Sequence, residues 1–292
     1  MATLICLGFG YSAEHFVKAF GEKFERIVGT LRSAERVAAL NAQSDGRVGA
    51  IVFDGKTASP ELLRAIGAAD AALISIPQDE HGDPVLRGCG DAFASAPHLR
   101  SVVYLSTVGV YGDCGGAWVD EDTPAVPTSG RGGDRLAAEQ AWRDCGARRG
   151  IAVAILRLAG IYGPDRNALI QLARGQARRI VKPSQVFNRI HVGDIAQTID
   201  AAFTRNASGI FNVADDEPSP QGDPIAFAAA LMGIAAPPEI AFEQAAPTMS
   251  PMALSFWQEC RRIKNDKLKS ELGVRLLYPT YREGLSALLA AS

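Results

Sequence analysis

The sequence predicts an α/β fold in which a doubly wound parallel sheet carries a smaller C-terminal α+β region. Short apolar runs alternate with stretches of helical periodicity over the first two-thirds of the 292 residues. Near-continuous apolar strands between amphipathic helices are typical of a parallel sheet covered on both faces. Beyond about residue 163 the pattern changes, and prolines gather between short helices such as 225–232. This change indicates a smaller, irregular region laid over the sheet.

Six apolar runs predict the strands, namely residues 4–7, 26–29, 48–53, 71–76, 102–105 and 152–156. Between the first two, apolar side chains at positions 13, 16, 17 and 20 follow the i, i+3, i+4, i+7 spacing of a helix packed on a sheet. We predict one domain over residues 1–163 with segments near 187–214, and a smaller region over about 164–186 and 215–292.

Composition and charge exclude several classes of function. Hydrophobic residues make up 47% of the chain and charged residues 21%, and the formal net charge is −2. This balance is ordinary for a globular protein and gives no electrostatic reason to expect nucleic acid or an anionic membrane as partner. The chain contains no apolar run of membrane-spanning length, and its start does not resemble a signal peptide. Five scattered cysteines and four dispersed histidines predict reduced thiols, no metal site and a cytoplasmic location.

A glycine turn follows the first predicted strand and opens the first predicted helix. The segment Gly8–Ala13 reads G-F-G-Y-S-A and fits the pattern G-x-G-x-x-G/A. The first glycine allows the tight turn, the second lets the backbone approach a pyrophosphate, and the helix N-terminus favours the phosphate charge. The turn predicts a Rossmann-type dinucleotide site, because strand, helix and following strand occur in the required order.

The end of the second strand indicates which dinucleotide binds. An NAD site usually places Asp or Glu there, whereas here the first charged residue is Arg32, flanked by the hydroxyls of Thr30 and Ser33. A guanidinium suits the oxygens of a 2′-phosphate, which favours NADP(H) over NAD(H), although NAD remains possible. The alternative is a solvated arginine at the start of the next helix.

Two further strand ends are expected to border the cofactor. Asp54 follows the third strand, where it can accept a hydrogen bond from an adenine amino group or simply form a turn. Ser75, Ile76 and Pro77 end the fourth strand, where the backbone would pass the cofactor ribose. The cofactor-binding residues predicted from strand ends are Gly8, Phe9, Gly10, Tyr11, Ser12, Arg32, Ser33, Asp54, Ser75, Ile76 and Pro77.

Three later segments carry a resemblance to a known family. They are the Val-Tyr-Gly segment within 104–112, the Arg…Tyr-Gly-Pro segment within 156–164 and the His-Val-x-Asp segment within 189–196. In this order and spacing the chain resembles the extended branch of the short-chain dehydrogenase/reductase superfamily, which includes nucleotide-sugar epimerases and dehydratases. The resemblance implies a catalytic role for Thr107, a nucleotide sugar as substrate and a homodimer.

The chain departs from this family at two places. The glycine turn is one residue shorter than the usual GxxGxxG and ends in Ala13. The Tyr-x-x-x-Lys pair is missing, because its positions fall on Arg131 and Arg135 in the segment before the helix that begins near Leu136. Arg135 could still hold the cofactor ribose, but a guanidinium with a pKa above about 12 is a poor proton carrier.

Another side chain would then have to move the proton. Tyr111, Tyr162 and His191 are the candidates, and each has the alternative of a packing or fold-stabilising role. Thr107 could likewise only cap the strand end. We predict Thr107, Tyr111 and Arg135 as catalytic residues, with Arg135 also at the cofactor.

The substrate is expected to be a small molecule, anionic or a nucleotide sugar. Arg131 and Arg135 precede a helix that should border the nicotinamide, which favours an anionic ligand. Arg174 and Arg178 would share a helix face, as a basic wall or as a solvated surface. The substrate residues predicted are Arg131, Asn167, Asn188 and Arg189.

Three hypotheses for function follow. The first is an NADP(H)-dependent oxidoreductase or epimerase-like enzyme with rearranged proton chemistry. The second is a non-catalytic NADP(H)-binding redox sensor or regulator, which the loss of the tyrosine favours. The third, an interaction protein without cofactor, requires the glycine turn to be accidental.

Overall fold

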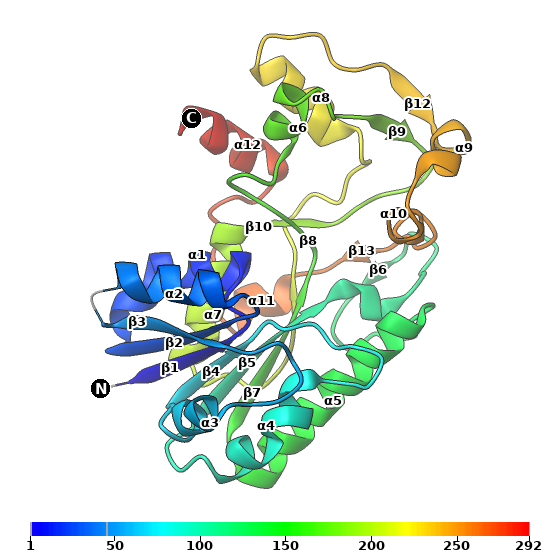
Figure 1. Cartoon of the computed structure of the whole chain (residues 1–292). Coiled ribbons are helices and arrows are strands. Elements are labelled where there is room, and N and C mark those ends of the chain that lie inside the picture. The colour runs from blue at the N-terminus through cyan, green and yellow to red at the C-terminus, as the bar shows by residue number, and fades with distance from the viewer. Residues whose placement is uncertain (1, 45, 292) are drawn as a thin grey trace.

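A seven-stranded parallel sheet forms the centre of the computed structural model, which describes residues 2–44 and 46–291 (Figure 1). The strand order is β11-β7-β5-β4-β1-β2-β3, and every neighbouring pair is parallel. The chain reverses its direction of winding between β1 and β4, so the sheet is doubly wound. The α/β prediction is confirmed. The strands of this sheet are β1 (Thr3–Leu7), β2 (Arg26–Leu31), β3 (Val48–Val52), β4 (Ala71–Ile74), β5 (Ser101–Thr107), β7 (Ala152–Leu158) and β11 (Gly209–Val213).

Helices cover both faces of the sheet (Figure 1). One face carries α1 (Tyr11–Phe20), α2 (Ala34–Gln43) and α7 (Val192–Thr204), and the other carries α3 (Pro60–Gly67), α4 (Pro84–Ser95) and α5 (Gly130–Arg149). Alternate residues of each strand therefore enter two separate cores: Leu4 and Cys6 of β1 join one, and Ile5 and Leu7 join the other. The strands are buried on both sides, as their apolar runs predict.

Several strands extend beyond their apolar runs, because buried partners satisfy the polar residues at their ends. β2 continues through Thr30, whose hydroxyl accepts a hydrogen bond from the Gly8 N–H. β5 continues through Ser106, whose hydroxyl donates to Glu139. β11 contains Asn212, which is buried and accepts from the Tyr111 hydroxyl. Apolar periodicity alone therefore ended β2 and β5 too early, and it did not predict β11.

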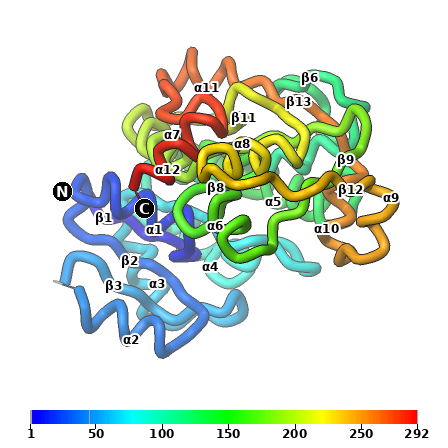
Figure 2. The backbone as a smooth tube through the Cα atoms, turned by 90° about the horizontal axis from the view of Figure 1, so that it is seen from above, coloured from blue at the N-terminus to red at the C-terminus, as the bar shows by residue number. Residues whose placement is uncertain are grey.

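The smaller region lies beyond the carboxyl ends of the strands (Figures 1 and 2). Helices α6, α8 and α12 pack together there, and the short strand pair β13–β6 connects this region to the sheet domain. Both views place β9, β12 and α9 farthest from β2 and β3. The elements not yet given are α6 (Ala168–Ala173), α8 (Asp223–Leu231), α9 (Phe242–Ala245), α10 (Pro251–Ser255), α11 (Asp266–Ser270), α12 (Tyr281–Ala290), β6 (Trp118–Val119), β8 (Gly160–Tyr162), β9 (Arg179–Val181), β10 (Arg189–His191), β12 (Glu239–Ala241), β13 (Arg262–Ile263), η1 (Gly21–Lys23), η2 (Val108–Tyr111) and η3 (Ala246–Thr248).

Two sequence expectations about helices are wrong. Arg174 and Arg178 do not share a helix face, because α6 ends at Ala173 and Gly175 then takes a positive φ of 65°. The segment that holds Arg131 and Arg135 does not precede a helix, because Ser129 caps α5 and both arginines lie in its first turns. Three glycines concealed this start, since glycine is a poor helix former.

Candidate cofactor and substrate site

Neighbouring strands brace the glycine turn on both sides. The Gly8 N–H donates to the Thr30 hydroxyl at 2.8 Å, and the Ser75 hydroxyl donates to the Gly8 carbonyl at 2.5 Å. Gly8 has φ of 96°, and an added Cβ would lie 2.7 Å from the Ser75 Oγ. Only glycine meets both the conformation and the close approach. β2 and β4 thus fix the turn at the carboxyl edge of the sheet.

The second glycine leaves an open cradle at the start of α1. A Cβ added at Gly10 would meet no atom within 4 Å, so it would project into free space over the turn. Gly10 is also the N-cap of α1, and among the described residues no side chain caps the helix there. The first N–H groups of α1, from Tyr11 and Ser12, thus face a region that a phosphate could fill. The turn fits the pyrophosphate of a dinucleotide.

Phe9 has a packing role within the same turn. Its side chain is buried, and a Cβ added at Gly29 would lie 2.6 Å from the Phe9 ring. Its N–H donates to the Thr30 carbonyl at 2.8 Å. Phe9 therefore anchors the turn on β2, and its predicted cofactor contact stays a prediction.

Arg32 stands at the carboxyl end of β2 with its side chain exposed. Within residues 2–44 and 46–291 it makes no side-chain hydrogen bond or ion pair, so its guanidinium is available to a ligand. Ser33 instead caps α2, accepting from the Arg36 N–H at 3.2 Å and donating to Glu35 at 2.5 Å. Arg32 alone of the predicted set remains free, since the Thr30 hydroxyl holds Gly8.

The ends of β3 and β4 carry the other predicted cofactor residues. Asp54 is exposed and accepts from the Lys56 N–H at 2.9 Å, which makes it part of a turn. The N–H groups of Ser75 and Ile76 both donate to the Leu7 carbonyl, at 2.8 and 3.1 Å. Pro77 follows on the exposed edge. Ser75 and Ile76 lie beside Gly8 of the β1–α1 turn, and the cofactor contacts of all four residues remain predictions.

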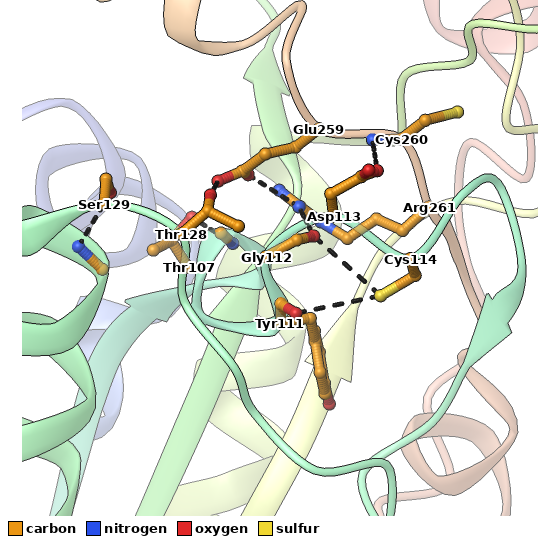
Figure 3. Close-up of polar contacts among 12 residues, drawn as sticks. Thr107, Tyr111, Gly112, Asp113, Cys114, Thr128, Ser129, Glu259, Cys260 and Arg261 are labelled. Carbon is orange, nitrogen blue, oxygen red and sulfur yellow. Dashed lines mark hydrogen bonds and ion pairs between the residues drawn. The ribbon is translucent and has the colours of Figure 1, made fainter.

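Thr107 ends β5 and borders a polar cluster from the C-terminal part of the chain (Figure 3). Its hydroxyl accepts from the Gly109 N–H at 3.1 Å. A Cβ added at Gly109 would lie 3.4 Å from the Thr107 Oγ1 and 4.0 Å from the Arg261 Nη2. The Thr107 hydroxyl and the Arg261 guanidinium thus flank the same small space above Gly109.

Arg261 is held in place by its own charge partner and by the loop after β5. Its Nη1 pairs with the Glu259 Oε2 at 2.7 Å and also donates to the Gly112 carbonyl. Glu259 in turn accepts from the Thr128 hydroxyl at 2.5 Å, and the Arg261 and Glu259 side chains are only 11% and 14% exposed. Arg261 Nε is buried without a partner among the described residues. The ion pair therefore places a rigid cation close to the end of β5.

Arg131 and Arg135 take different positions on α5. Arg131 is exposed in the first turn, where its carbonyl accepts from Gln78 at 2.9 Å. Arg135 is half-buried, donates to the Leu105 carbonyl at 2.8 Å and lies over the Tyr104 ring. The side chain of Arg135 is therefore engaged with β5. Its role at the ribose, and the register that equates both arginines with Tyr and Lys, stay predictions.

The structure does not bring the three candidate proton carriers to Thr107. Tyr111 points away from the cluster in Figure 3, and its buried hydroxyl donates to Asn212 at 2.9 Å. Tyr162 is buried, and its hydroxyl donates to the Thr280 carbonyl at 3.3 Å. His191 caps α7 through Nδ1, and burial lowers its pKa to about 4. Burial raises the pKa of both tyrosines, so neither hydroxyl ionises easily.

A pocket of about 440 Å³ lies between β8, α6, α8, α12 and the segment 253–257. Asn167, Asn188 and Arg189 line it, so the structure brings these three predicted substrate residues together. Their polar groups are nevertheless engaged: Asn167 bonds the Gly163 carbonyl and the Ile170 N–H, and Asn188 bonds the Arg261 carbonyl and the Ile263 N–H. Arg189 donates to the carbonyls of Phe187 and Pro220 and to the Ser219 hydroxyl.

Sequence reasoning missed Arg166, Glu259 and Arg261 as site residues. Arg166 lines the pocket and lies with its guanidinium 4.2 Å from the centre of the Tyr11 ring. The Glu259–Arg261 segment is 149 positions from the Gly112 carbonyl that it contacts, and no local pattern marks it. The adjacent basic residues Arg261 and Arg262 were the one visible signal.

Within residues 2–44 and 46–291, no helix has the length and apolar character needed to cross a membrane. The same residues contain no group of three or more His, Cys, Asp or Glu side chains placed to hold a metal ion.

Comparisons with known proteins agree with the fold. The model of the NAD dependent epimerase/dehydratase family matches residues 91–214. A UDP-glucose 4-epimerase from Azospirillum brasilense is 36% identical over 84 residues, which are 29% of this chain and 24% of that protein. The chain spans less than half the length of the curated relatives that it matches.

Solved structures match along the whole chain. A functionally unknown conserved protein from Silicibacter pomeroyi DSS is 44% identical, with 100% of this chain and 99% of that chain covered and a TM-score of 0.89. A candidate NAD-dependent epimerase/dehydratase from Methylobacillus flagellatus is 25% identical, with 99% and 98% covered and a TM-score of 0.73. More distant neighbours that share the fold include structures in complex with NAD.

The braced glycine turn, the strand order and these matches lead to one assignment. Residues 91–214 match the NAD dependent epimerase/dehydratase family, and the whole chain has the fold of solved epimerases and dehydratases.

Proposed function

We propose that the protein is an NADP(H)-dependent oxidoreductase that acts on a small carbonyl or alcohol compound. The observation that carries the proposal is the open cradle over Gly10, which the uncapped N-terminus of α1 faces at the carboxyl edge of the sheet. The free guanidinium of Arg32 at the end of β2 supports the 2′-phosphate form of the cofactor.

Two residues at the end of β5 would handle the reacting oxygen. A bound nicotinamide would supply or accept hydride. The Thr107 hydroxyl would hydrogen-bond the substrate oxygen, and the Arg261 guanidinium, held by Glu259, would stabilise negative charge that develops on it. Such a fixed cation needs no reorganisation during the reaction. Water at the exposed first turn of α5 would provide the proton, since the Tyr111 and Tyr162 hydroxyls lie in buried bonds.

A second function has one observation in its favour. Tyr111, Tyr162 and His191 are all turned into packing or capping contacts, which suits a protein that binds the cofactor without using it. A non-catalytic NADP(H)-binding redox sensor is therefore the alternative.

Titration of NADPH and NADH, followed by nicotinamide fluorescence, tests the cofactor. We expect Arg32→Ala to weaken NADPH binding roughly tenfold or more and to leave NADH binding unchanged, because a charge-assisted bond contributes about 1.5–3 kcal/mol. Arg26→Ala, at the other end of β2, is the matched control and should change neither. Equal NADPH affinity in wild type and Arg32→Ala would refute the 2′-phosphate contact. Binding of neither nucleotide below millimolar concentration would refute the cofactor itself.

Turnover then separates the enzyme from the sensor. NADPH consumption with a panel of aldehydes and ketones is expected for the enzyme, with a loss of about a hundredfold in Thr107→Val, since one oxyanion donor contributes 10²–10³ in rate. Tight NADPH binding without turnover on any member of the panel favours the sensor.

A further inference from the structure

The walls of the substrate pocket are apolar and largely aromatic. Phe187 and Trp257 meet edge to face with ring centroids 4.9 Å apart, and Tyr281, Ile225 and Leu285 also line the pocket. Phe256 is 61% exposed although it lines the pocket, which places it at the rim. A volume of about 440 Å³ is near the lower end of small-molecule sites, which span about 300–1,000 Å³. These walls favour an apolar body as ligand.

Three polar residues of the pocket, Asn167, Asn188 and Arg189, are already engaged in bonds within the protein. The side-chain amide of Asn167 bonds backbone groups at 2.8–3.0 Å and caps α6. The side-chain amide of Asn188 bonds the backbone of Arg261 and Ile263 at 2.9 Å. Arg189 donates through Nη1 and Nη2 to the carbonyls of Phe187 and Pro220 and to the Ser219 hydroxyl. Freeing any of them would leave buried backbone groups without partners, which is costly.

Arg166 differs from these residues. It lines the pocket, its side chain is exposed, and in the described part of the chain its guanidinium makes no hydrogen bond or ion pair. It lies over the Tyr11 ring, whose hydroxyl donates to the Pro164 carbonyl beside the glycine turn. One free cation therefore stands where the pocket opens toward the cofactor turn, and a carboxylate would pair with it.

We propose that this pocket takes a small carboxylic acid with an aryl or alkyl body, and not a nucleotide sugar. The inference rests on the proposed function, because it names the substrate class of the same site. The apolar body lies between the Phe187–Trp257 pair and Tyr281, under Phe256, and the carboxylate pairs with Arg166.

Calorimetric titration of the free protein tests the class of ligand directly. The probes are trans-cinnamate, decanoate, the neutral cinnamamide and UDP-glucose. We expect one of the acids to bind below millimolar concentration, more tightly than UDP-glucose. Phe256→Ala should weaken that binding about tenfold, since the ring loses apolar contact with the ligand. Met252→Ala is the matched control, because Met252 on α10 is 55% exposed but does not line the pocket.

The Arg166→Ala variant tests whether Arg166 binds the carboxylate of the ligand. It should remove the preference of the pocket for cinnamate over cinnamamide. The proposal is wrong if UDP-glucose binds more tightly than the acids, or if no acid binds. It is also wrong if Phe256→Ala and Met252→Ala have equal effects, or if Arg166→Ala keeps the preference for the acid. The proposed function fails separately, by loss of NADPH binding, because these titrations need no cofactor.

Discussion

Glu139 and Arg157 form an ion pair at the interface between α5 and the sheet. Their side chains are 2% and 3% exposed, and the guanidinium contacts both carboxylate oxygens at 2.7–3.2 Å. The Ser106 hydroxyl donates to the same carboxylate, and Arg157 also lies over the Tyr111 ring. A buried pair of this kind fixes the position of α5 against β5 and β7, because either charge alone would be strongly unfavourable there.

Removal of one partner should therefore be costly. We expect Glu139→Gln to lower the free energy of unfolding by about 3 kcal/mol, since it leaves the Arg157 charge without its counter-ion. Urea denaturation measures the change. The exposed pair of Glu14 and Arg36 is the control, and Glu14→Gln should cost about 0.5 kcal/mol or less. Similar costs for the two variants would contradict the role given to the buried pair.

Some residues of the candidate site could be predicted from the sequence and others could not. Thr107 and Arg32 could be predicted, because each follows an apolar run and so lies at a strand end. Arg261 could not, because only the pairing of β13 with β6 brings it to Gly112. Tyr111 and Asn188 were named for motif position alone, and motif position does not reveal which way a side chain points.

The β1–α1 turn is the element in which sequence and structure agree most closely. Its glycines have distinct roles. A Cβ at Gly8 would clash with Ser75 after β4, whereas a Cβ at Gly10 would enter open space. Turn, strand and helix follow local chain order, so the whole element could be predicted from a short segment. The start of α5 could not, because the cap at Ser129 outweighs the low helix propensity of three glycines.

The contrast between the two glycines gives a prediction for this turn. Gly10→Ala should change the free energy of unfolding by about 1 kcal/mol or less, because its Cβ meets no neighbour and the residue is only a helix cap. The same methyl group would occupy the space expected for the pyrophosphate, so NADPH affinity should fall at least tenfold. Nicotinamide fluorescence and urea denaturation measure the two effects. An unchanged NADPH affinity would argue against a phosphate over this turn.

At the scale of the whole molecule, the smaller region completes the site that the sheet begins. The sheet domain supplies the glycine turn and Thr107, while the C-terminal region supplies Arg261, Phe256 and Trp257. The division into domains stays a prediction from the cluster of prolines. The sequence did not predict the contacts, which join residues more than 100 positions apart. The homodimer remains a prediction.

Two buried groups with opposite behaviour connect the molecule's stability to pH. Burial raises the pKa of Asp215 to about 8, and one of its carboxylate oxygens has no partner among the described residues. Burial lowers the pKa of His191 to about 4. Between pH 4 and 6.5 the unfolded chain binds one more proton at His191 and one fewer at Asp215, so the two slopes cancel.

Above pH 6.5 His191 is neutral in both states, whereas Asp215 still distinguishes them. The folded state keeps a proton there that the unfolded chain has lost, so stability falls as pH rises toward 8. At about 1.4 kcal/mol per pH unit, the loss between pH 6.5 and 8 is about 2 kcal/mol. Asp215→Asn should abolish this loss and uncover a rise in stability from pH 4 to 6.5 that belongs to His191. Urea denaturation across this range measures both slopes, and a variant whose stability still falls above pH 6.5 would show that Asp215 is ionised in the folded protein.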